Sequence, residues 1–161
     1  MLIPLAVSLL VAQAPATPSA DLPAGLWDSR WEIDTSASDD PMPLMRKLGL
    51  SFMQLRKLPR PQVQTTSLTA ERLSVTAAGL DGEKRQLFPL DGKTPTLGDF
   101  LGVPFEVVTR VEAGAVVSSG VITIDKVKTS FMSRRSVDGD VMRVELTVGD
   151  LRSKRVFRRL K

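Results

Sequence analysis

Short segments in which apolar and polar residues alternate fill the chain after residue 61, and this pattern constrains the fold more than any other feature. Successive side chains of a strand point to opposite faces, so the alternation in 105–112 and 141–148 predicts strands with one buried face. Glycine-containing turns separate such segments, as is typical of hairpins. The turn signals are Asp81-Gly82, Asp91-Gly92, Ala113-Gly114, Asp138-Gly139 and Gly149-Asp150. The sequence therefore predicts antiparallel strands in meander order.

This pattern indicates an all-β domain with a short helix pair. We expect about eight to ten strands that close into an up-and-down antiparallel β-barrel. The predicted strands are residues 25–34, 62–68, 71–77, 84–90, 105–111, 115–124, 128–136, 141–148 and 151–160. Residues 94–103, with two glycines, are expected to form a longer irregular connection. Periodicity leaves two registers open for the last strand: one directs Arg155 and Phe157 inward, and the other directs Val156 and Leu160 inward.

Residues 44–59 form the exception, because their apolar residues recur at helical spacing. Gly49 interrupts the stretch and prolines follow it, so we expect two short helices joined near Gly49. Asp40 before Pro41 is a good N-cap and first-turn pair. The expected apolar face holds Leu44, Met45, Leu48, Phe52, Met53 and Leu55. We expect the pair to cap one end of the barrel, either as a ligand portal or as a plug over a packed core.

The chain of 161 residues contains no histidine and no cysteine. Common zinc sites and nucleophile systems that need those residues therefore cannot be built. Asp39 and Asp40 resemble a paired-carboxylate site only superficially, and helix capping explains them better. We expect no enzymatic activity, no cofactor and no metal site.

The first 16 residues are typical of a secretory signal peptide. An apolar run too short to span a bilayer precedes Ala14-Pro15-Ala16, which fits a cleavage site, although no basic residue precedes that run. A buried first strand or a frayed tail is the alternative. Residues 17–24 are expected to be a flexible leader, and 25–161 a single domain. The expected location is secreted or periplasmic.

The C-terminal part of the chain is basic, with eleven Lys or Arg and four Asp or Glu from Lys126 onward. One hypothesis is therefore a non-catalytic interaction module whose filled barrel presents a basic face to an anionic partner. That face would comprise Arg134, Arg143, Arg152, Lys154, Arg158 and Lys161. We expect no nucleic-acid partner, because no aromatic residues are interleaved with these cations.

Several motifs resemble the fatty-acid-binding proteins, a family of calycin, or lipocalin-like, barrels. Gly25-Leu26-Trp27 is similar to the Gly-x-Trp that opens their first strand, and 45–58 is similar to the helix-turn-helix that follows it. Val144-Glu145, the turn Gly149-Asp150 and Arg155-Val156-Phe157 resemble their last two strands without a gap. In the middle of the chain, only the regular succession of predicted hairpins agrees with this family. The usual members of the family are cytosolic, so the expected signal peptide is a departure.

The resemblance implies a carrier that holds a fatty acid or similar acidic lipid in an apolar cavity. Arg155, helped by Arg135, would bind the ligand's carboxylate, and Phe157 stands where the family has a tyrosine. The other expected ligand-binding residues are Phe105, Val144 and Leu146 in the barrel and Met45 and Phe52 on the helices. We expect a monomer that makes transient contact with a membrane surface. The alternative for both arginines is an exposed position on a strand.

The cleavage site gives a direct prediction. If residues 1–16 are a signal peptide, the mature protein begins near Thr17 and is found outside the cytoplasm. N-terminal sequencing of the exported form checks this. A cytosolic product that retains Met1 would contradict it.

Overall fold

The computed structural model describes Leu22 and residues 25–161. The predicted signal peptide and all of the predicted leader except Leu22 therefore lie outside the described residues. Among the described residues, no helix is long and apolar enough to span a membrane.

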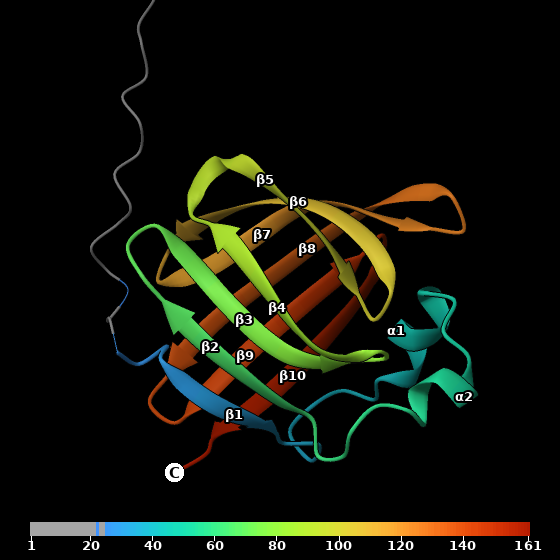
Figure 1. Cartoon of the computed structure of the whole chain (residues 1–161), viewed down its shortest axis with the longest axis horizontal. Helices are drawn as coiled ribbons and strands as arrows, with labels where there is room; N and C mark the ends of the chain where they lie inside the picture. The colour runs from blue at the N-terminus through green and yellow to red at the C-terminus, as the bar shows by residue number, and fades with distance from the viewer. Residues whose placement is uncertain (1–21, 23–24) are drawn as a thin grey trace, which may run out of the picture.

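Ten antiparallel strands form one sheet that curls into a nearly closed up-and-down barrel (Figure 1). The strands are β1 (Ser29–Ile33), β2 (Val63–Leu68), β3 (Arg72–Gly79), β4 (Gly82–Pro89), β5 (Asp91–Phe100), β6 (Val103–Glu112), β7 (Ala115–Ile124), β8 (Val127–Asp138), β9 (Val141–Val148) and β10 (Leu151–Arg159). Their order in the sheet is β4-β3-β2-β1-β10-β9-β8-β7-β6-β5. From β2 to β4 and from β5 to β10, sequential strands pair as hairpins. β1 pairs with β2 and with β10, which joins the two ends of the sheet's chain. The predicted barrel of eight to ten strands is confirmed.

The barrel has one seam, between β4 and β5, which are the two ends of the sheet order. Side chains hold it together. Lys84 Nζ on β4 lies 2.8 Å from Asp99 Oδ2 on β5. Gln86 Nε2 donates to the Asp99 carbonyl at 2.7 Å, and Thr96 Oγ1 donates to the Leu87 carbonyl at 3.1 Å.

The prediction of an irregular connection over 94–103 was wrong, because most of that segment belongs to β5. As the strand beside the seam, β5 pairs only with β6, so Pro95 is tolerated there. A Cβ at Gly98 would lie 2.8 Å from Phe105 Cζ, which explains the glycine. Asp91-Gly92 was likewise wrong as a hairpin turn, since the strands on either side of it are not paired.

Two other turns lie one residue from their predicted positions. The β3–β4 turn is Leu80-Asp81, and the β8–β9 turn is Gly139-Asp140. The shifts leave the expected order of the strands unchanged.

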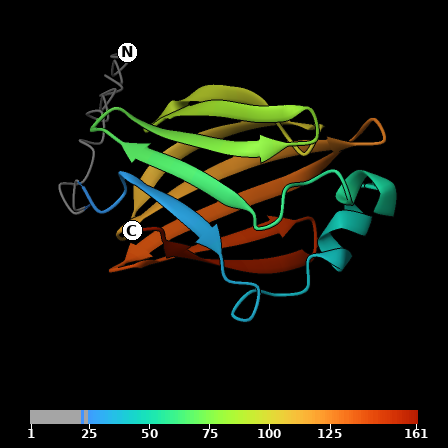
Figure 2. The same ribbon diagram turned by 60° about the horizontal axis from the view of Figure 1, so that its bottom comes forward.

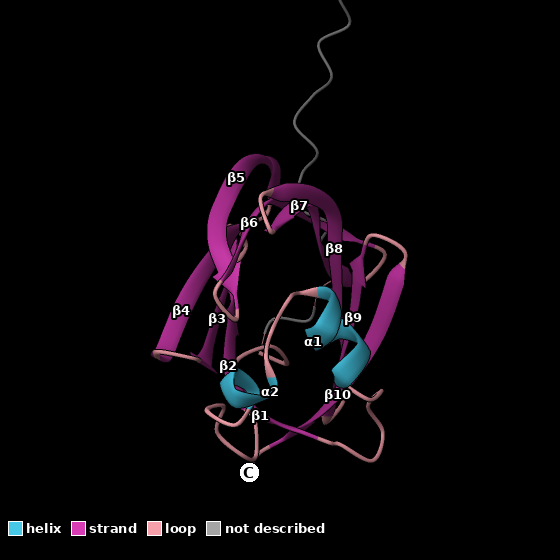
Figure 3. Cartoon of the chain, turned by 90° about the vertical axis from the view of Figure 1, so that its right-hand side faces the viewer, coloured by secondary structure: helices cyan, strands magenta, loops and turns pink. Residues whose placement is uncertain are grey.

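The helix pair, α1 (Met42–Lys47) and α2 (Phe52–Leu55), covers one end of the barrel (Figures 2 and 3). The break falls where predicted, with Gly49 at a φ of 74°. Ser51 and Gln54 form a reciprocal capping box that starts α2. The Asp40 carboxylate accepts the Met42 amide at 3.0 Å, so Asp40 caps α1 from one residue before the N-cap, Pro41.

The expected continuous apolar face does not form. Leu44 and Leu48 pack into the barrel core, whereas the Phe52 side chain is 59% exposed. The break at Gly49 resets the helical phase, so α2 does not continue the face of α1. The Arg56 guanidinium carbon lies 4.9 Å from the centre of the Phe52 ring.

Two buried tryptophans, Trp27 just before β1 and Trp31 within it, belong to the barrel core. The buried Trp31 Nε1 donates to Thr66 Oγ1 at 2.8 Å, and Thr66 Oγ1 donates in turn to the Trp27 carbonyl. The Arg159 guanidinium carbon lies 4.7 Å from the centre of the Trp31 ring. These contacts tie the chain before β1 to β2 and β10.

This architecture predicts uneven protection from amide exchange. Residues 44–58 should exchange fast, α2 fastest, because α2 is a single turn with only Leu55 buried. Residues 142–148 should exchange slowly, because β9 is paired on both sides. Hydrogen–deuterium exchange read by mass spectrometry measures both segments in one sample. Equal protection of the two would mean that the helix pair is a rigid plug.

Candidate functional site

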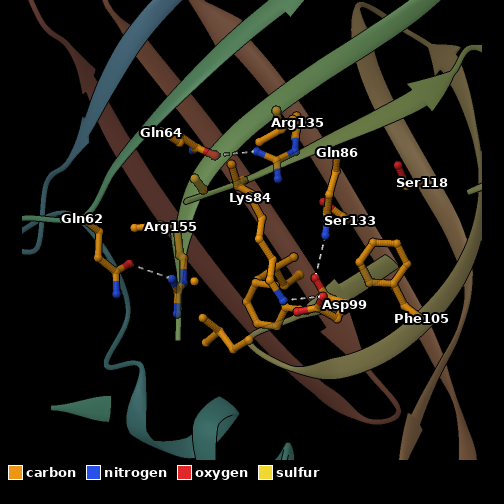
Figure 4. Close-up of a pocket in the computed structure, with 18 of the residues that line it drawn as sticks. Gln62, Gln64, Lys84, Gln86, Asp99, Phe105, Ser118, Ser133, Arg135 and Arg155 are labelled. Carbon is orange, nitrogen blue, oxygen red and sulfur yellow. Dashed lines mark hydrogen bonds and ion pairs between the residues drawn. The ribbon is translucent and has the colours of Figure 1, made fainter. Parts of the chain in front are cut away.

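An interior cavity of about 160 Å³ lies between the helix pair and the middle of the barrel (Figure 4). One enclosed water molecule needs about 10–15 Å³ of comparable space. Every strand except β1 contributes to the wall. Phe88, Phe105 and Phe131 stack along one side, with ring centres 6.3 Å and 5.9 Å apart. The cavity is therefore large enough for a ligand and mainly apolar.

Two arginines project into this cavity. Arg135 on β8 and Arg155 on β10 both pair with Val144 of β9, so all three share the inner face. Phe157 faces inward as well. The structure thus decides between the two registers left open for the last strand. Val156 lies on the outer face and is buried there by residues 34–39, where Ser38 Oγ accepts its amide at 2.9 Å.

Each arginine is bonded to a glutamine. Arg155 Nη1 donates to Gln62 Oε1 at 3.1 Å, and Arg135 Nη1 donates to Gln64 Oε1 at 3.2 Å. Among the described residues, no carboxylate lies within 4.0 Å of either guanidinium. Arg155 Nη2, Gln64 Nε2 and Ser133 Oγ belong to residues that line the cavity, and they are buried without a hydrogen-bond partner among the described residues. The cavity wall therefore contains hydrogen-bond donors that have no acceptor among the described residues.

Burial makes both cations costly. It lowers the pKa of Arg135 to about 10, and repulsion from Arg155 adds to that shift. Burial also lowers the pKa of Arg155. Guanidinium still keeps its proton at neutral pH, so two positive charges stay inside the barrel. A buried cation is stable only when it is paired with an anion or fully hydrogen-bonded. Here each arginine has a hydrogen bond to a glutamine but no carboxylate partner among the described residues.

The ion pair at the seam also faces the cavity. Burial raises the pKa of Asp99, but hydrogen bonds from Lys84 and from the Gly102 amide outweigh that effect and hold it below its usual value. The hydrogen bond to Asp99 raises the pKa of Lys84. Both groups are therefore charged near neutral pH, and their charges cancel.

The structure brings most of the predicted site together. Arg135, Arg155, Phe157, Val144, Leu146 and Phe105 all line the cavity. Met45 and Phe52 do not. Met45 is buried in a separate cluster with Leu55 and Leu58, and Phe52 lies on the outer surface. The sequence prediction placed both on one helical face, and the break at Gly49 separates them.

Sequence reasoning missed seven polar residues of the wall: Gln62, Gln64, Lys84, Gln86, Asp99, Ser118 and Ser133. Gln64 lies on the same inward face of β2 as Leu68, and Lys84 lies on the same inward face of β4 as Phe88. A polar residue on an otherwise apolar strand face could therefore have indicated these two positions. Asp99 gave no such signal, because its segment did not look like a strand. The described residues contain no cluster of three or more acidic, cysteine or histidine side chains suited to a metal.

No family model matches the sequence, and no curated protein matches it. Solved structures do match. A Schistosoma mansoni fatty-acid-binding protein in complex with arachidonic acid aligns with a TM-score of 0.68 and 18% identity, over 85% of this chain and 98% of that one. Caenorhabditis elegans lipid binding protein 8, in its apo form, aligns with a TM-score of 0.69 and 11% identity, over 88% and 100%.

The fold is that of the fatty-acid-binding proteins. Secretory abundant heat soluble protein 4 of Ramazzottius varieornatus shares this fold, with a TM-score of 0.65, 13% identity, and 93% and 100% of the two chains covered. The fold implied by the sequence motifs at the two ends is therefore confirmed.

Because the buried arginines have no carboxylate partner among the described residues, we expect that removing one of them does not destabilise the fold. Arg155→Met in the ligand-free protein should leave the free energy of unfolding unchanged or raise it, by at most about 4 kcal/mol, because a buried charge is removed. Lys84→Met should lower it, because Asp99 would lose its partner across the seam. Urea unfolding of the three proteins measures both changes. A marked loss of stability in Arg155→Met would mean that its bond to Gln62 supports the fold.

Proposed function

We propose that this protein is an exported carrier of a hydrophobic ligand with an anionic head group, a fatty acid or similar acidic lipid. The observation that carries the proposal is a mainly apolar cavity with two guanidinium groups that face no carboxylate among the described residues. An apolar chain gains affinity by leaving water, at about 25 cal/mol per Å² buried. Charge-assisted hydrogen bonds would fix the head group.

Phe157 bears on how the head group is held. The resemblance implies a tyrosine hydroxyl at this position, and phenylalanine removes that donor. Two other unpaired donors, Ser133 Oγ and Gln64 Nε2, line the same cavity. We infer that they supply the hydrogen bonds that Phe157 cannot.

The route into the cavity would pass the helix end of the barrel. The cavity is lined there by Leu58 after α2, Gly79 before the β3–β4 turn and Leu101 after β5. Leu55, Leu58, Leu80 and Leu101 pack with Met45 into a small cluster at that end. Displacing this cluster would open the cavity while leaving the β ladders intact.

The comparisons support a lipid ligand, whereas the exported location is proposed from the sequence. Two proteins with this fold are described as binding fatty acid or lipid, one of them in complex with arachidonic acid. Export rests on residues 1–16 of the sequence. The use of the same fold in a protein described as secretory makes export compatible with it.

The rival hypothesis, a filled barrel that presents a basic outer face, is less well supported. A packed interior would favour that module, whereas a cavity that reaches Arg155 favours a carrier. We therefore retain the carrier as the proposed function.

Removing Arg155 tests this proposal. Arg155→Met should weaken fatty-acid binding on the order of tenfold to a hundredfold, or about 1.4–3 kcal/mol, because a charge-assisted contact is lost. Arg72→Met is the matched control, since Arg72 is exposed at the start of β3. Titration with a fluorescent fatty acid gives the affinities. Wild-type protein that binds no fatty acid and no other acidic lipid would overturn the proposal.

A further inference from the structure

The spacing of the two interior arginines bears on the charge of the ligand, given the proposed carrier function. Arg135 and Arg155 lie two strands apart and face the same residue, Val144, between them. Neighbouring strands are about 4.8 Å apart, so their backbones are separated by roughly 10 Å. Both arginine side chains and the small Val144 line the cavity, and Figure 4 shows the two guanidinium groups inside it. A single head group lying over Val144 can therefore face both guanidiniums.

The charges of the cavity do not balance. The charged residues that line it, among those described, are Lys84, Asp99, Arg135 and Arg155. Lys84 and Asp99 neutralise each other at 2.8 Å. Two positive charges remain. A ligand with one negative charge would leave one buried cation uncompensated, whereas a ligand with two would neutralise the interior.

The supply of hydrogen bonds points the same way. The oxygens of Gln62 and Gln64 already accept from the two arginines. Among the described buried atoms without a hydrogen-bond partner, those on residues that line the cavity are Arg155 Nη2 and Gln64 Nε2, which can only donate, and the hydroxyl of Ser133. These three groups come from β10, β2 and β8, so they approach from different strands. Phosphate has three strong acceptor oxygens and carboxylate has two.

We propose that the cavity selects a single-chain lipid whose head group carries two negative charges, such as a phosphate monoester, over a lipid of equal chain length with one charge. Arg135 and Arg155 bind the two charges, and Gln64 and Ser133 complete the hydrogen bonding. The proposal rests on the proposed carrier function and specifies its ligand class.

The composition makes this proposal testable by pH. The chain has no histidine or cysteine, whose pKa values would fall near neutrality. The pKa of Asp99 lies below its usual value, that of Lys84 lies above it, and that of Arg135 is about 10. Arg155 remains a guanidinium. Between pH 5 and pH 8 the phosphate, with a second pKa of about 6, is the group that changes charge at the site.

Dodecyl phosphate and dodecyl sulfate are a matched pair, because the sulfate keeps one charge at both pH values. Their affinities, with that of dodecanol, are measured by displacement of a fluorescent fatty acid at micromolar concentration. At pH 8 dodecyl phosphate should bind on the order of tenfold more tightly than the sulfate, or about 1.4 kcal/mol. At pH 5 the ratio should fall to about threefold or less, because the phosphate then carries mainly one charge.

The outcomes separate the two proposals. Equal binding of phosphate and sulfate at pH 8, both tighter than dodecanol, would overturn the two-charge inference and leave the carrier function standing. Dodecanol that binds as well as both anions would overturn both proposals. Failure of all three to bind would overturn the carrier function itself.

Variants locate the effect. Arg135→Met should reduce the phosphate-to-sulfate ratio at pH 8 to near one, because one interior charge remains. Arg72→Met should keep the wild-type ratio, since Arg72 is exposed. Urea unfolding of each variant confirms that it is folded before its affinity is read. An unchanged ratio in folded Arg135→Met would overturn the inference.

Discussion

Pairing between the first and last strands is the constraint on which the rest of the structure depends. β1 pairs with β10 from Trp31 with Arg159 to Ile33 with Phe157, and this ladder turns a meander into a barrel. Side chains alternate along a strand, so a slip of one residue in β10 would move Arg155 outside and bring Lys154 and Val156 inside. The position of the interior charge therefore follows from the pairing of residues more than 120 positions apart.

Much of this fold can be read from local sequence, and the failures have physical causes. Alternation predicts β6 and β9 because one face of each strand is buried against the apolar interior. It fails for β5, whose middle holds Pro95 and Gly98 and whose outer edge has no partner strand. Phe52 was misplaced because one apolar face was expected to continue across Gly49 from the first helix to the second.

The candidate site was harder to predict than the fold. Periodicity could not orient β10, because Val156 on its outer face is also buried, under the connection that includes Ser38. A resemblance at the two ends of the chain supplied the arginines. The glutamines that hold them lie near β2, far away in sequence, and Gln64 was detectable only as a polar residue on an apolar face. Contacts of this kind depend on the closed barrel and not on local pattern.

The seam between β4 and β5 has a further consequence. An open sheet has two edges with unpaired backbone groups, and such edges are templates for aggregation. Here the two edges face each other, and the side chains of Lys84, Gln86 and Thr96 span the space between them. Neither edge is therefore freely offered to another chain. Widening the barrel at this seam would stretch these three side-chain contacts and leave every backbone ladder intact, so the seam is the part of the wall best suited to follow the size of an enclosed molecule.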